Sequence, residues 1–103
     1  MAADALTPQH GARFLLELER EEGAGARYRA AVLTPDARFD YDAMLGDDGA
    51  VSLTARGAPA PAELEETLVM IARLTARSAA KKREDGLPPW PHRVLRWRGP
   101  GRG

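Results

Sequence analysis

Apolar side chains recur every three or four residues between about Pro61 and Asp85, which is the period of an amphipathic helix. The stripe expected to face the core comprises Leu64, Leu68, Ile71, Leu74 and Ser78, widened by Val69, Ala72, Thr75 and Ala79. The opposite face is mostly charged, with Glu66, Arg73, Arg77 and Lys81. The pattern predicts one long helix that packs on the core through a single face.

Both ends of this helix carry residues that favour a helix terminus. Pro61 suits a first helical position, and the acidic residues at 63, 65 and 66 lie where the helix dipole is positive. The last turns carry the cations that the dipole favours there, namely Lys81, Lys82 and Arg83. Gly86 can adopt the left-handed conformation of a C-terminal cap, and Pro88 prevents the helix from continuing.

Upstream of the helix, alternating apolar and polar side chains predict three strands, Arg27 to Thr34, Arg38 to Leu45 and Ala50 to Ala55. The first strand is expected to turn Tyr28, Ala30 and Val32 to one side, and the second Phe39, Tyr41, Ala43 and Leu45. Residues 34–37 and 46–49 have the proline, glycine and aspartate content of tight turns. These features predict an antiparallel meander.

The segment Ala12 to Glu22 has two interpretations. As a helix it would use Thr7 as its cap and Pro8 as its first residue. As a strand it would turn Phe14, Leu16 and Leu18 inward and pair with Arg27 to Thr34 through Gly23-Ala24-Gly25. We favour the strand, because Gly11 weakens the start of a helix and a connection containing glycine suits a hairpin.

Beyond the helix, residues 87–91 are expected to be extended, since residues that precede proline avoid the helical region. His92 to Arg98 then alternates like a short strand, and Gly99 to Gly103 is expected to be a disordered tail. The predicted fold is α+β: an antiparallel β-meander of three to four strands with one long amphipathic helix packed on one face, and a short C-terminal strand or arm. We expect a single domain over residues 1–98.

The composition is that of an ordinary globular protein. Of the 103 residues, 44% are hydrophobic and 29% charged, which does not match the profile of a disordered chain. There is no cysteine, which excludes disulfides, thiolate metal sites and cysteine nucleophiles. The apolar runs are too short to cross a membrane and no secretory leader is recognisable, so we expect a cytoplasmic protein without a membrane partner.

The zero formal charge conceals an asymmetry along the chain. Residues 1–67 carry 13 acidic and 6 basic side chains, a net charge of −7, and residues 68–103 carry 2 acidic and 9 basic ones, a net charge of +7. The basic part predicts an anionic partner, but we favour the alternative that the two parts neutralise each other in the folded chain. The abundance of Ala, Arg, Gly and Pro also indicates a GC-rich coding sequence, which lowers the weight of any basic patch.

No motif of catalytic, cofactor or metal chemistry is present. The acidic group of Asp40, Asp42, Asp47 and Asp48 lacks the spacing of a calcium loop, so it is interpreted as a solvated strand face and a turn. The sequence also lacks a nucleophile elbow, a phosphate-binding loop and a helical pair of metal-binding histidines. We therefore expect no enzyme and no cofactor.

The C-terminal part is the best candidate for binding, because arginines and tryptophans alternate in it. The residues predicted to contact a partner are Lys81, Lys82, Arg83, Trp90, Arg93, Arg96, Trp97 and Arg98. We favour the interpretation that the tryptophans seal the small core, and we consider a protein partner or single-stranded nucleic acid as alternatives. The resulting hypothesis is a small binding or accessory module that acts through protein contacts or self-association, with nucleic-acid binding as the second choice.

Overall fold

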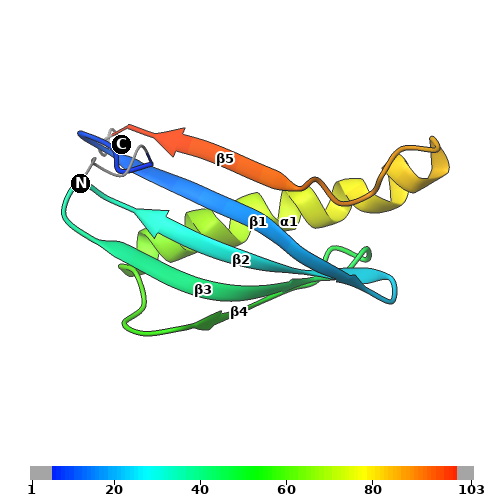
Figure 1. Cartoon of the computed structure of the whole chain (residues 1–103), viewed down its shortest axis with the longest axis horizontal. Coiled ribbons are helices and arrows are strands. Elements are labelled where there is room, and N and C mark those ends of the chain that lie inside the picture. Colours follow the sequence, from blue (N-terminus) through cyan, green and yellow to red (C-terminus); the bar gives the residue numbers. More distant parts are fainter. Residues whose placement is uncertain (1–5, 100–103) are drawn as a thin grey trace.

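The computed structural model describes residues 6–99, in which five strands form one antiparallel sheet that packs against a single helix (Figure 1). The strands are β1 (Ala12–Glu22), β2 (Gly25–Leu33), β3 (Arg38–Leu45), β4 (Val51–Ala55) and β5 (Arg93–Arg98), and the helix is α1 (Ala62–Glu84). Their order across the sheet is β4-β3-β2-β1-β5. The predicted α+β class, meander, helix and C-terminal strand are confirmed. Apart from Gly99, the predicted tail Gly99 to Gly103 lies outside the described residues.

The segment Ala12 to Glu22 is a strand, as favoured, and the helical interpretation is wrong. It pairs with β2 through a two-residue turn at Gly23 and Ala24, with Leu16 opposite Ala30. Phe14 and Leu16 point to the helix side, while Leu15 is buried on the other face of the sheet with Ala31 and Leu33. A strand buries both sets because its side chains alternate between the two faces, whereas a helix would bury only one stripe.

The core lies between the sheet and α1 (Figure 1). The predicted inward faces of β2 and β3 are confirmed, since Tyr28, Val32, Tyr41 and Leu45 are each at most 2% exposed. Phe14 completes this layer from β1. These large side chains fill the space that the helix covers, so the sheet face and the helix stripe stabilise each other.

The buried stripe of α1 differs from the predicted one at three positions, Leu74, Ala76 and Ser78. Leu68 and Ile71 are buried, but the remaining contacts come from alanines: Ala72, Ala76 and Ala79. Leu74 is 57% exposed, and Ser78 is exposed as well. The alanines let the helix lie close to the large side chains of the sheet, and this rotation turns Leu74 and Ser78 toward the β5 side. Gly86 ends the helix with φ 75°, the left-handed conformation expected there.

Buried tyrosine hydroxyl groups hold the two connections of the helix. The Tyr41 hydroxyl accepts a hydrogen bond from the Ala60 amide at 2.7 Å and donates one to Glu65 at 2.8 Å, just before and inside the first turns of α1. On the other side of the core, the Tyr28 hydroxyl donates to the Pro91 carbonyl at 2.8 Å. Both ends of α1 are therefore tied to the interior of the sheet.

Candidate functional site

A groove of about 290 Å³ runs between α1 and the edge strand β5. Its apolar lining comes from Ile71 and Leu74 of the helix and Val94 of the strand. On the helix side, Thr75 and Ser78 also line the groove, one and two turns after Ile71. The groove follows both elements lengthwise, so its shape suits an extended chain better than a compact ligand.

The backbone of β5 has hydrogen-bonding groups on its outer side. The Leu18 amide donates to the His92 carbonyl at 2.8 Å, and Leu16 lies opposite Val94 in the same register. Bonded pairs alternate in an antiparallel ladder, so the even-numbered residues of β5 bond to β1. The amide and carbonyl groups of Arg93, Leu95 and Trp97 consequently point away from the sheet, along the outer edge.

The groove is cationic. Its lining includes Lys82, Arg93, Arg96 and Arg98, and of the described residues that line it none is a carboxylate. The Arg93 side chain lies 4.0 Å from Glu17 on the other face of the sheet, and the Arg96 guanidinium donates to the Leu95 carbonyl at 3.0 Å. Four of the predicted contact residues are thus brought together at one edge.

Lys81 and Arg83, also predicted to contact a partner, have acidic neighbours within the fold. Lys81 lies 3.5 Å from Asp85, one turn further along, and Arg83 donates to Asp47 at 2.7 Å. The Arg83 pair joins the basic part of the chain to the acidic part, as the neutralisation hypothesis expects. Arg83 and Arg93 make such contacts, but Lys82, Arg96 and Arg98 face the groove instead.

The two tryptophans have different positions. Trp90 is 2% exposed and packs edge-on against Tyr28, so its ring seals the core and lies out of reach of a partner. Trp97 is 46% exposed, contacts the ring of His10 and donates from Nε1 to the His10 carbonyl at 3.0 Å. The core-sealing interpretation therefore describes Trp90 and is wrong for Trp97.

The helix wall of the groove was missed by sequence reasoning. Leu74, Thr75 and Ser78 were assigned to the core because they continue the apolar stripe. The run of alanines at 72, 76 and 79 was the available signal, since small residues mark the line along which a helix can approach a sheet most closely.

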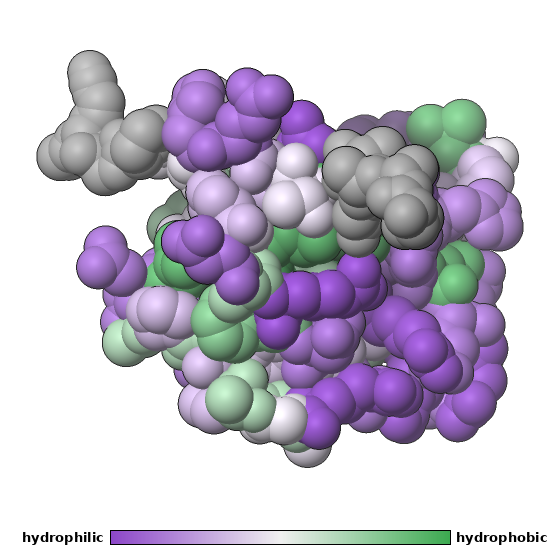
Figure 2. All heavy atoms as spheres, turned by 60° about the vertical axis from the view of Figure 1, so that its left-hand side comes forward, coloured by the Kyte–Doolittle hydropathy of each residue, from purple (hydrophilic) through white to green (hydrophobic). Residues whose placement is uncertain are grey.

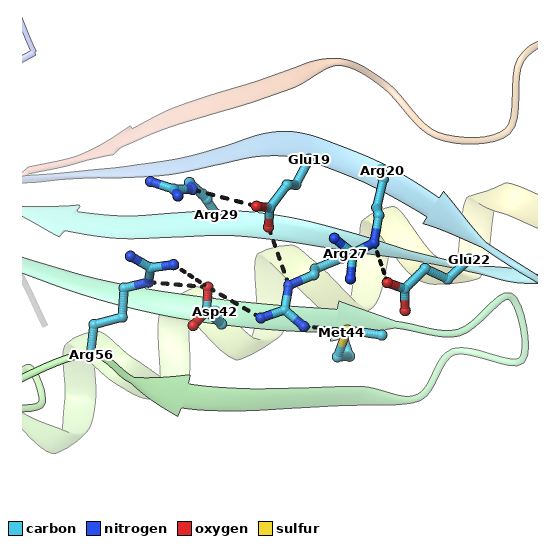
Figure 3. Close-up of polar contacts among 8 residues, drawn as sticks. All are labelled: Glu19, Arg20, Glu22, Arg27, Arg29, Asp42, Met44 and Arg56. Carbon is cyan, nitrogen blue, oxygen red and sulfur yellow. Dashed lines mark hydrogen bonds and ion pairs between the residues drawn. The ribbon is translucent and has the colours of Figure 1, made fainter.

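The other face of the sheet, away from α1, carries a network of ion pairs (Figure 3). Figure 2 turns the left-hand side of Figure 1 toward the viewer, and hydrophilic residues dominate that view. Across the strands the pairs are Arg29 to Glu19 (3.8 Å), Arg27 to Glu19 (3.2 Å), Arg27 to Asp42 (3.8 Å) and Arg56 to Asp42 (3.0 Å). Arg27 and Arg29 of β2 and Arg56, which follows β4, therefore neutralise Glu19 and Asp42 locally.

Asp42 is the carboxylate most affected by this network. The Arg56 guanidinium donates to Asp42 at 3.1 Å and holds the pKa of that carboxyl below its usual value. Asp40 pairs with Arg38 at 2.9 Å, and Asp48 accepts a hydrogen bond from the Ala50 amide in the turn. The four predicted acidic residues thus have separate partners.

A shallow hollow of about 430 Å³ lies in this face, above Leu15 and Ala31. Its rim carries both signs of charge, with Arg29, Arg38, Arg56, Glu17 and Asp40. Because the arginines there are already close to carboxylates, a bound anion would compete with the protein's own ion pairs. The α1/β5 groove, whose cations face no carboxylate in the lining, is the stronger candidate for a binding site.

Among residues 6–99, no group of three or more acidic or imidazole side chains is placed to hold a metal ion. In the same part of the chain, no helix is long and apolar enough to cross a membrane. Comparison with protein-family models, with curated proteins and with solved structures gives no significant match. Any function must therefore be argued from the geometry of this fold.

Proposed function

We propose that this protein is a non-enzymatic binding module that takes up an extended, acidic segment of a protein partner as an additional strand on β5. The observation that carries the proposal is the coincidence of an outward-facing strand edge with a groove that Lys82, Arg96 and Arg98 face and whose lining contains no carboxylate. Addition of a strand to a sheet edge is a recurring mode of peptide recognition. Main-chain hydrogen bonds supply affinity, and contacts with alternate side chains supply specificity.

The alternation of side chains defines the partner further. In a strand added to β5, every second side chain would point to the helix side and enter the groove. There the apolar surface of Ile71 and Leu74 and the charges of Lys82, Arg96 and Arg98 would contact it. The favoured segment thus has both aliphatic and acidic residues among the side chains on its helix-facing side, which are the residues at every second position.

Arg96 has a contact at this edge in the free protein and a different one in the proposed complex. Its guanidinium bonds to the Leu95 carbonyl, one of the groups that an added strand would use. Arginines along an edge strand also hinder two identical edges from pairing, because like charges would lie side by side. An acidic segment would remove this repulsion and release Arg96 to pair with a carboxylate.

The arrangement favours a protein segment over nucleic acid. Binding of single strands combines cations with aromatic rings on one surface. Trp97 shares the outer face with Leu95, whereas Arg96 and Arg98 are on the helix side, because successive residues of a strand alternate between faces. Arg93 lies on the same face as the Trp97 ring, but it lies 4.0 Å from Glu17. The exposed ring and the cations that face the groove therefore do not form a common surface.

The experiment is a fluorescence-anisotropy titration, at several salt concentrations, with a labelled ten-residue peptide that carries Val and Glu in turn at every second position and Thr between them. We expect saturable binding that weakens as salt rises, and shifts of the Arg93, Leu95 and Trp97 amide signals in NMR spectra of the labelled protein. A peptide with Lys in place of Glu should not bind. An oligothymidine is titrated alongside.

Two double variants are compared, and each of them reverses two positive charges. Arg96→Glu with Arg98→Glu should abolish binding, while Arg73→Glu with Arg77→Glu, on the exposed side of α1 away from the groove, should have a much smaller effect. Equal loss in both variants, or amide shifts confined to other strands, would contradict the β5 site. Tighter binding of the oligothymidine than of the peptide would replace the proposal with the nucleic-acid hypothesis.

A further inference from the structure

The opposite edge of the sheet, formed by β4, has a different chemistry from β5. Val51 to Ala55 contains no charged residue and no proline, and its side chains are all at least partly exposed. Natural edge strands are usually protected by charges, proline or a bulge, because an unprotected edge pairs with other chains. No irregularity in the register of β3 and β4 interrupts this strand.

The hydrogen bonds at its two ends show which backbone groups face outward. The Gly46 amide donates to the Ala50 carbonyl at 2.9 Å, and the Arg56 amide donates to the Asp40 carbonyl at 2.8 Å. Even-numbered residues of this segment therefore bond to β3. The amide and carbonyl groups of Val51, Leu53 and Ala55 point away from the sheet.

We propose that β4 pairs antiparallel with β4 of a second copy of this chain, with Leu53 on the two-fold axis. In this register Leu53 meets its own counterpart, and Val51 of each copy meets Ala55 of the other. In each of these pairs, both residues have backbone amide and carbonyl groups that point away from their own sheet. The two residues of every pair can therefore form two backbone hydrogen bonds with each other. The edge is therefore complementary to itself, as a two-fold interface requires.

The charges at the ends of β4 favour the same arrangement. Asp48, which has no ion-pair partner among the contacts of residues 6–99 described above, lies in the turn before the strand, and Arg56, which also contacts Asp42, follows the strand directly. Antiparallel pairing brings the acidic end of one copy to the basic end of the other, whereas parallel pairing would place like charges together. On the outer face Ser52 of one copy would lie opposite Thr54 of the other, and both are exposed and small enough to be accommodated.

This surface is independent of the proposed function, because it lies at the other edge of the sheet. In the dimer the two sheets become one continuous sheet, and the two α1/β5 grooves lie at its opposite ends. The proposed dimer thus leaves both grooves accessible, and either proposal can fail without the other.

Sedimentation velocity of the full chain over a range of concentrations tests the dimer. Wild type should sediment as a dimer at high concentration. Ser52→Lys with Thr54→Lys places lysines of the two copies opposite one another, and it should raise the dimer dissociation constant by at least about tenfold. Met70→Lys, which adds a lysine to an exposed position of α1, should leave dissociation unchanged and serves as the matched control.

Amide hydrogen exchange distinguishes loss of the interface from loss of the fold. In wild type the Val51, Leu53 and Ala55 amides should be protected, and the double lysine variant should lose that protection while the β3 amides keep theirs. Ala55→Pro gives a second variant, because it removes an outward amide and spares the bonds to β3. A monomer at all concentrations, a dimer that persists in the double lysine variant, or assemblies that keep growing would overturn the proposal.

Discussion

The Tyr28 hydroxyl donates a hydrogen bond of 2.8 Å to the carbonyl of Pro91. The bond links the middle of β2 to the segment that leads into β5 and lies beneath β1, which separates those two strands in the sheet. Tyr28 is fully buried, and burial raises the pKa of its phenol well above the ordinary value. The neutral hydroxyl is therefore available as a donor throughout the neutral range, where it fixes the course of the chain into the candidate binding edge.

Tyr28→Phe should lower the free energy of unfolding by about 1 kcal/mol, the usual contribution of one hydrogen bond. Because the lost bond positions Pro91, the amides of β5 should also exchange faster than those of β2 and β3. Urea denaturation and hydrogen exchange measure the two effects. Uniformly faster exchange in all strands would show that the bond has no particular role at β5.

Trp90→Ala should destabilise the fold by about 3 to 5 kcal/mol, since it removes a large side chain from the core. Trp97→Ala, at an exposed position, should cost less than about 1 kcal/mol. Trp90→Phe should be milder than Trp90→Ala, because Trp90 Nε1 has no hydrogen-bond partner among the described residues and the phenyl ring removes that buried donor. Thermal and urea melts compare the three variants, and equal losses for Trp90→Ala and Trp97→Ala would refute their different placement.

Leu68→Ala or Ile71→Ala should destabilise by about 2 to 4 kcal/mol, the range for a truncated core aliphatic residue. Leu74→Ala should change stability by less than about 0.5 kcal/mol and weaken binding of the acidic peptide instead, because Leu74 lines the groove. Urea denaturation and the anisotropy titration separate the two roles. A large stability loss for Leu74→Ala would restore the original assignment of that residue to the core.

Tyr41→Phe should lower the free energy of unfolding by about 1 to 3 kcal/mol, since it leaves the Ala60 amide buried without its acceptor. Glu65→Gln keeps a side chain that can accept from the Tyr41 hydroxyl and should cost less. Urea denaturation of both variants checks the order. If Glu65→Gln were the more damaging, the charge of Glu65 would matter more than the Ala60 contact.

The lowered pKa of Asp42 predicts that the stability of the fold depends on pH. Arg56 lowers the pKa of Asp42 in the folded chain, so the unfolded chain takes up its proton first as the pH falls. The stabilisation is therefore fully present above about pH 5 and is lost progressively below about pH 4. Asp42→Asn should make unfolding less dependent on pH in that range, as measured by urea denaturation. In NMR titrations Arg56→Gln should return the Asp42 pKa toward its ordinary value, and an unchanged pKa would contradict the pairing.

The strands and the helix boundaries were predictable because local chemistry determines them. Alternation in β2 and β3 follows from one buried face, and Pro61 and Gly86 bracket α1 as expected. The rotation of the helix was not predictable in the same way. Leu74 and Ala76 both fit an apolar stripe, and only the shape of the sheet beneath decides which of them is buried.

The candidate site was predicted in part. Basic residues of the C-terminal part were identified from composition and charge, and Lys82, Arg93, Arg96 and Arg98 do line one groove. The sequence could not show that Trp90 is buried and Trp97 exposed, because the proline neighbours of the one and the arginine neighbours of the other do not determine burial. The difference in their burial depends on the pairing of β5 with β1, which is a contact between distant parts of the chain.

That pairing also affects how the chain is made. Phe14 lies opposite Arg96 across the β1/β5 ladder, so β1 remains without its second neighbour until the ribosome has released β5. During that interval the β1–β4 meander can form, but the outer edge of β1 is unshielded. Contacts between residues so distant in sequence slow folding. The newly synthesised chain therefore exposes β1 as an open edge until β5, the last of the five strands, has paired with it.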